Sequence, residues 1–135
     1  MVRNIPIGHA GQKTVRVTPE IAVSFMGHAG ARVLATPHLI SLLEFTARDS
    51  VKPLLEDGYD SVGTEVNVRH LAATPVGMQV TFHSRVVAID DRKIRFEVEA
   101  FDEVEKVCEG IHERFVINVE RFAARLDVKR KKIES

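Results

Sequence analysis

The segment TPHLISLLEFTAR, residues 36–48, decides the fold. Thr36 followed by Pro37 is a typical helix start, because Thr caps a first turn and Pro at the first helical position lacks only an N–H that has no partner there. We predict a helix from Thr36 to about Leu55. Large apolar side chains fall on every side of its first half. That pattern is typical of a buried helix rather than a surface helix.

The hydrophobic period changes to two after this helix. Alternating apolar residues predict four long strands, at about 62–70, 80–88, 94–100 and 107–119. A shorter alternating run at 13–17 predicts one strand before the helix. A helix with apolar side chains all round needs a sheet wrapped around it. The sequence therefore predicts an α+β hotdog fold, with an antiparallel sheet wrapped around one long central helix.

Length and charge point to one domain. The chain has 135 residues, and nineteen basic side chains balance nineteen acidic ones. This length fits a single domain over 1–135, with a core at about 13–122 and a basic C-terminal tail at 123–135. We interpret the tail as solvated and frayed. The alternative is that its basic run, 129–132, contacts a phosphate or a nucleotide.

Several classes of protein are excluded. A net charge of zero argues against a nucleic-acid binder. No apolar run is long enough to span a membrane, and residues 1–6 do not resemble a signal peptide, so we expect a cytoplasmic protein. Cys108 is the one cysteine and cannot form an internal disulfide or a thiolate metal site. The six histidines show no zinc-ligand spacing, and we expect neither a metal ion nor a cofactor.

Glu44 fits the helix pattern least. It lies in the most apolar stretch of the chain, where a carboxylate loses hydration unless it is paired or protonated. A carboxylate held in such a place is a candidate for base chemistry. The alternative is that Glu44 lies on one solvent-facing edge of the helix.

Four other residues are candidates for the same site. His70 ends a strand and is either a proton carrier or a structural residue. Thr36 stands at a helix N-terminus, whose N–H groups stabilise anions. Gly63 interrupts a strand, which indicates a bulge, a ligand contact or close packing against the helix. Arg114 is either a partner for a carboxylate or phosphate or an ordinary exposed strand residue.

Three segments carry a resemblance to a known family. They are VLATP with LLE (33–37 and 42–44), VGTEVNVRHLAATPVGM (62–78) and EGIHER (109–114). Together they resemble the fluoroacetyl-CoA thioesterase-like family of hotdog proteins. The resemblance extends from about residue 13 to residue 122.

This resemblance implies an acyl-CoA thioesterase, which hydrolyses its substrate to a free acid and CoA. Coenzyme A is then part of the substrate and not a cofactor. A homodimer, or a larger oligomer, is implied, with active sites near the subunit interface. By motif position the catalytic residues are Thr36, Glu44 and His70. Gly63 and Arg114 match the residues that contact the substrate.

One stretch departs from the family. The fluoroacetyl-specific enzyme carries phenylalanines in a lid before the helix, whereas SFMGHAG, residues 24–30, has one Phe and two Gly. We therefore predict a plainer, short acyl group, with fluoroacetyl-CoA selectivity as an alternative. Two other functions remain open: a hotdog hydratase or dehydratase, and a non-catalytic binder of acyl-CoA or another small ligand.

Overall fold

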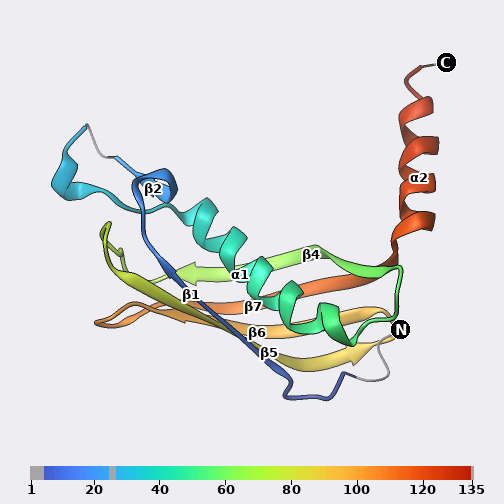
Figure 1. Ribbon diagram of the computed structural model, residues 1–135, viewed down its shortest axis with the longest axis horizontal. Coiled ribbons are helices and arrows are strands. Elements are labelled where there is room, and N and C mark those ends of the chain that lie inside the picture. The colour runs from blue at the N-terminus through green and yellow to red at the C-terminus, as the bar shows by residue number, and fades with distance from the viewer. Residues whose placement is uncertain (1–4, 25–26, 135) are drawn as a thin grey trace.

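A computed structural model describes residues 5–24 and 27–134. Its main sheet has five antiparallel strands in the order β1-β5-β6-β7-β4 (Figure 1). The strands are β1 (Ala10–Arg16), β4 (Tyr59–His70), β5 (Gln79–Asp90), β6 (Lys93–Phe101) and β7 (Lys106–Asn118). A small two-stranded ladder pairs β2 (Ala22–Val23) with β3 (Val33–Leu34). The predicted strands are therefore confirmed, and the small ladder is an addition to them.

The helix α1 (Thr36–Val51) connects β3 to β4 and lies across one face of the sheet (Figure 1). Its buried apolar residues recur every four positions, which places them in one line along the helix. They are Leu39, Leu43, Ala47 and Val51. This line packs on inward-facing strand residues such as Phe82 and Phe96, both fully buried. The predicted hotdog arrangement is confirmed.

The start of α1 differs from the prediction. Ala35 is the N-cap, so Thr36 and Pro37 occupy the first two helical positions. The Thr36 side chain makes no capping hydrogen bond and is available for another contact. The predicted capping role of Thr36 is therefore wrong.

The end and the outer side of α1 also differ. The α-helix stops at Val51 because Pro53 has no N–H and its ring clashes with the preceding turn. Lys52–Leu54 continue as a short 3₁₀ helix. Phe45 is 51% exposed, so the helix is covered by the sheet on one side only. Among the large apolar residues in the first half of α1, Phe45 is therefore the one that departs from the predicted burial.

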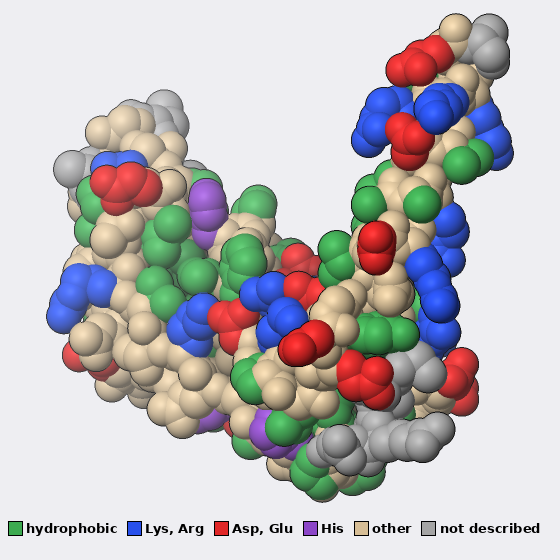
Figure 2. Space-filling view, turned by 45° about the vertical axis from the view of Figure 1, so that its right-hand side comes forward, with side chains coloured by type: hydrophobic (Ala, Val, Ile, Leu, Met, Phe, Trp, Pro, Cys, Tyr) green, Lys and Arg blue, Asp and Glu red, His purple; other side chains and the backbone are tan. Residues whose placement is uncertain are grey.

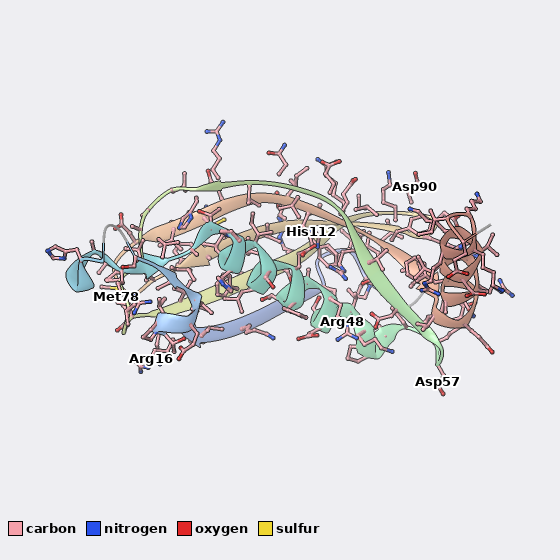
Figure 3. All side chains as sticks on the ribbon, turned by 90° about the horizontal axis from the view of Figure 1, so that it is seen from above. Arg16, Arg48, Asp57, Met78, Asp90 and His112 are labelled. Carbon is pink, nitrogen blue, oxygen red and sulfur yellow. The ribbon has the colours of Figure 1, made fainter. Side chains whose placement is uncertain are left out.

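The C-terminal segment is a helix and not a frayed tail. α2 (Val119–Lys131) follows β7 directly, and the Arg121 N–H donates to Asn118 Oδ1 at 3.0 Å, which caps the first turn. Basic residues in its last turn complement the helix dipole. None of its residues is buried. It stands out from the sheet on the side that α1 covers (Figures 1 and 3).

The space-filling view shows the surface hollowed between α2 and the part that carries β2 and β3 (Figure 2).

Phe25 and Met26, in the stretch that departs from the family, lie outside the described residues. Later in the same stretch of sequence, Ala29–Ala31 form a short 3₁₀ helix. In the described part of the chain, no helix is long and apolar enough to cross a membrane.

β1 and α1 approach closely at Gly11. A Cβ atom placed there would lie 2.5 Å from Ser50 Cβ, 2.8 Å from Ser84 Oγ and 3.0 Å from the Thr46 carbonyl oxygen. Any side chain would therefore push the strand and the helix apart, and glycine is the residue that permits this spacing.

We predict that Gly11→Ala lowers the free energy of unfolding by about 1–3 kcal/mol, because the added methyl overpacks this contact. Chemical denaturation measures the change. Gln12→Ala, at the next and exposed position, serves as the control and shifts stability by no more than about 0.5 kcal/mol. A Gly11→Ala protein as stable as the wild type would contradict the close approach.

Candidate functional site

A cavity of about 320 Å³ lies between α1 and β4. The helix lines it with residues spaced i, i+3, i+4 and i+7, which share one helix face. These residues are Ser41, Glu44, Phe45 and Arg48. The sheet lines it with Ser61, Val62, Gly63 and Arg114. Three of the five predicted site residues, Glu44, Gly63 and Arg114, therefore share one cavity.

Glu44 is half-buried and faces this cavity. It is therefore neither enclosed in the apolar core nor on a fully solvent-facing edge of the helix. Among the described residues it takes part in no hydrogen bond or ion pair. Its charge acts through space on two buried side chains of β7, His112 and Arg114. An unpaired carboxylate beside a cation is available to act as a base or a nucleophile.

Gly63 lies at a β-bulge, where the pairing of β4 with β7 shifts between Gly63 and Glu65. A Cβ atom at this position would collide with Glu44 Oε1. The missing side chain is therefore what allows the carboxylate to lie against the strand. The bulge indicated by the sequence is confirmed, and it coincides with close packing against the helix. The role of Gly63 as a substrate contact stays a prediction.

Arg114 is 6% exposed, so the alternative of an ordinary exposed strand residue is wrong. Its Nε and Nη2 donate to Ser61 Oγ and to the Ser61 carbonyl oxygen, each at 2.7 Å, and Nη1 lies 3.2 Å from His112 Nε2. Burial lowers the pKa of the guanidinium from its ordinary value, and the carboxylates of Glu44 and Asp60 oppose this shift. An arginine stays charged at neutral pH even so. The cavity therefore contains a cation in one fixed orientation.

Thr36 and His70 form a separate pair. Thr36 Oγ1 lies 2.7 Å from His70 Nδ1, in hydrogen-bond distance. The other ring nitrogen, Nε2, is buried and has no hydrogen-bond partner among the described residues. A buried polar atom without a partner is uncommon in a complete structure. His70 Nε2 is thus a buried polar atom that the described part of the single chain leaves without a partner.

One chain does not bring all five predicted residues together. Thr36 precedes Glu44 by eight residues on α1, about 12 Å of helix rise. Gly63 precedes His70 by seven residues on β4, about 23 Å of extended strand. We call Glu44, Gly63 and Arg114 the acid half-site, and Thr36 with His70 the histidine half-site. Each chain carries one of each.

Sequence reasoning missed three residues around the acid half-site: Arg48, Ser61 and His112. The helix spacing shared by Glu44 and Arg48 was a usable signal for the first. Arg48 donates to both carboxylate oxygens of Asp60, at 3.1 and 2.6 Å, and this pairing lowers the pKa of Asp60. No sequence signal marks Ser61, which is 53 positions from its partner Arg114.

A larger cavity of about 700 Å³ lies on the sheet face that points away from α1. Its charged side chains pair with one another, as Arg85 does with Glu97 and as Lys106 does with Glu99 and Glu109. Because these charges are already satisfied, we take the smaller cavity as the candidate site.

Metal and thiol chemistry find no support around these cavities. No cluster of three or more His, Cys, Asp or Glu side chains within 5–24 and 27–134 could hold a metal ion. Burial raises the pKa of the Cys108 thiol to about 11, so this cysteine stays protonated at neutral pH.

The chain is similar in sequence and in structure to known thioesterases. The sequence profile of a family described as fluoroacetyl-CoA-specific thioesterase matches residues 17–120. The fluoroacetyl-CoA thioesterase of Streptantibioticus cattleyicolor is 37% identical over 94 residues, which cover 70% of this chain and 68% of that protein. A solved fluoroacetyl-CoA thioesterase superposes with a TM-score of 0.85 at 31% identity, over 93% of this chain and 98% of that one. A Thermus thermophilus member of the thioesterase superfamily superposes with a TM-score of 0.88 at 28% identity, over 98% of each chain.

We predict that Gly63→Ala displaces the Glu44 carboxylate but leaves the fold nearly as stable. The new methyl meets the far end of a flexible side chain rather than backbone, so we expect a loss of about 1 kcal/mol or less. Denaturation measures the stability, and a crystal structure of the variant locates the carboxylate. A loss as large as that of Gly11→Ala, or a carboxylate that does not move, would contradict this packing.

Proposed function

The chain belongs to the fluoroacetyl-CoA-specific thioesterase family, and on that premise we propose that it hydrolyses a short-chain acyl-CoA to a free carboxylic acid and CoA. One observation carries the proposal: Glu44 is an unpaired, half-buried carboxylate in a cavity that also contains the fixed cation of Arg114. This pair offers a base or nucleophile beside a group that stabilises negative charge.

The dimensions of the cavity support a short acyl group. A volume of about 320 Å³ is at the small end for ligand sites. Five of its eight lining residues are polar or charged, whereas a fatty acyl chain needs a long apolar tunnel. A variant of the related fluoroacetyl-CoA thioesterase has been solved with fluoroacetate and CoA. The single Phe in residues 24–30 supports a plain acyl group over fluoroacetyl selectivity.

The half-sites supply the groups that thioester hydrolysis requires. Glu44 either takes a proton from a water whose oxygen attacks the carbonyl carbon, or attacks directly to form an anhydride that water then hydrolyses. In both routes the C–S bond breaks, and the thiolate leaves with a proton from His70. Thr36 holds the His70 ring through Nδ1. The oxyanion is stabilised by the N-terminus of α1 or by the N–H of Gly63.

We infer a homodimer from the free edge of β4. β4 is the last strand of the sheet, and residues 63–67 on it are all exposed. An exposed strand edge with unpaired backbone groups is a template for pairing with another chain. The edge of β4 is twelve residues long, against seven for the opposite edge strand β1.

Antiparallel pairing of two β4 strands would join the half-sites. A two-fold axis near Val66, in the middle of the exposed edge, exchanges the ends of the two strands. His70 then lies beside the partner subunit's Gly63. Each of the two sites would combine the acid half-site of one protomer with the histidine half-site of the other.

The remaining features of the proposal follow from the substrate class. CoA arrives as part of the thioester, so we propose that it is substrate and that the enzyme uses no separate cofactor. We propose that the enzyme works in the cytoplasm as a single hotdog unit per chain, without a nucleic-acid or membrane partner.

We predict that Glu44→Ala lowers kcat by about 100-fold or more on a panel of acyl-CoAs, because general-base steps contribute effects of this size. A thiol-detecting reagent measures the released CoA. Glu120→Ala, an exposed carboxylate on α2, is the matched control and keeps the wild-type rate. Equal rates for Glu44→Ala and wild type would remove Glu44 from the mechanism. A hydratase would release no thiol, and a binder would leave the thioester intact.

Mixed dimers test whether the two half-sites come from different chains. Co-refolded Glu44→Ala and His70→Ala protomers form mixed dimers in which one composite site keeps both wild-type residues. We expect such dimers, purified by two affinity tags, to regain about half of the wild-type activity, since one of two sites is intact. Analytical ultracentrifugation checks the dimer. Mixed dimers as inactive as the two parents would place each complete site within one chain.

A further inference from the structure

His112 is a buried histidine on β7 that the proposed mechanism does not use. It is 1% exposed and stacks on Phe96, with ring centroids 6.0 Å apart. It lies beneath α1 near the middle of the sheet (Figure 3). Nδ1 lies 2.8 Å from the Glu65 carbonyl oxygen, and Nε2 lies 3.2 Å from Arg114 Nη1. Both ring nitrogens are therefore in hydrogen bonds.

The partners of His112 decide its tautomer. The Glu65 carbonyl can only accept a hydrogen bond, so Nδ1 carries the proton. The Arg114 guanidinium can only donate, so Nε2 carries a lone pair. A doubly protonated ring would point an N–H at another N–H of a cation. The contacts thus require a neutral imidazole.

The surroundings of His112 lower its pKa overall, which also favours the neutral ring. Burial is the largest effect and lowers the pKa of His112, and the Arg114 cation lowers it further. The hydrogen bond to Glu65 and the carboxylates of Glu44 and Glu113 raise it, without reversing the direction. The folded protein therefore keeps this ring neutral at pH values where a free histidine is already protonated.

His112 and the acid half-site converge on one point. The three heavy atoms nearest to a Cβ placed at Gly63 are Glu44 Oε1, His112 Cε1 at 3.3 Å and Arg114 Nη1 at 3.5 Å. Arginine has five N–H groups, and three of those on Arg114 donate to Ser61 and His112. Two N–H groups are left, one on Nη1 and one on Nη2, and Nη1 is the nitrogen that lies near Gly63 on the same side as the Glu44 carboxylate.

We propose that His112 is a positioning residue for the reaction: its neutral ring accepts a hydrogen bond from Arg114 and thereby orients the guanidinium toward the Glu44 carboxylate. The role rests on the proposed thioesterase activity. Protonation of His112 would remove the acceptor and place a second cation beside Arg114. The orientation of Arg114, and with it turnover, would therefore be lost in acid.

Two substitutions separate positioning from packing. His112→Phe keeps a ring on Phe96 but can neither accept nor donate a hydrogen bond. His112→Gln keeps a side chain that accepts and does not titrate. We expect His112→Phe to lower kcat by about 10- to 100-fold with a smaller change in KM, because His112 acts through Arg114 and its loss costs less than the roughly 100- to 1,000-fold of a hydrogen bond made directly to the transition state. His112→Gln restores most of that loss, and its kcat falls less steeply than that of the wild type in the acid range below the ordinary pKa of histidine, where the lowered pKa of His112 places its protonation.

His83 provides the matched control. It also lies on a strand and contacts a phenylalanine ring, that of Phe101, with ring centroids 6.1 Å apart. Unlike His112, it lines the cavity on the sheet face that points away from α1. His83→Phe and His83→Gln should keep wild-type kinetics and the wild-type pH profile. Wild-type kinetics in His112→Phe, or equal losses in His112→Phe and His112→Gln, would overturn the positioning role.

A spectroscopic readout keeps the failure of this proposal distinct from failure of the proposed function. In protein labelled with ¹⁵N-histidine, long-range NMR correlations report the tautomer and titration of each ring. We expect His112 with its proton on Nδ1, and we expect Arg114→Met to raise its pKa. A proton on Nε2, or a titration that Arg114→Met leaves unchanged, would overturn the proposal. Absence of thiol release by the wild type, with these spectra as expected, would overturn the thioesterase assignment and with it the catalytic role of His112.

Discussion

The packing of one apolar line of α1 against the sheet decides what every other face of the helix can contact. Leu39, Leu43, Ala47 and Val51 occupy the buried line, so side chains on the opposite side of the helix, such as that of Phe45, turn away from the core. One of the remaining helix faces carries Glu44 and faces β4 across the cavity. The Glu44 carboxylate fits against the strand because Gly63, at the β-bulge, has no side chain. The acid half-site is thus a consequence of how the core is packed.

The buried cation beside this carboxylate is held by neutral groups. A buried charge is costly unless hydrogen bonds compensate it. Ser61 and His112 supply those hydrogen bonds to Arg114 without adding negative charge. Among the described residues, no carboxylate is therefore hydrogen-bonded to this cation, and Glu44 acts on it through space. Arg48, in contrast, is paired with Asp60 at the side of the same cavity.

Local patterns were sufficient for the elements of the fold and for part of the site. The alternation of apolar residues located the long strands, and the place of Glu44 in the helix and of Gly63 in a strand marked both as unusual. Three local features were misread: Thr36 is not the N-cap of α1, Pro53 ends α1 early, and Asn118 caps a helix that extends through most of the predicted tail. All three are punctuation signals whose effect depends on neighbouring residues.

By itself, the sequence determined the type and order of the elements, because hydrophobic period and capping depend on near neighbours along the chain. Only the tertiary structure decided which side chains meet. The hydrogen bonds of Arg114 with Ser61 and of Thr36 with His70 join residues 53 and 34 positions apart. Such contacts depend on strand order and register, which no local pattern encodes. The physical reason is that hydrogen bonds and charges act over a few ångströms in space, whatever the separation in sequence.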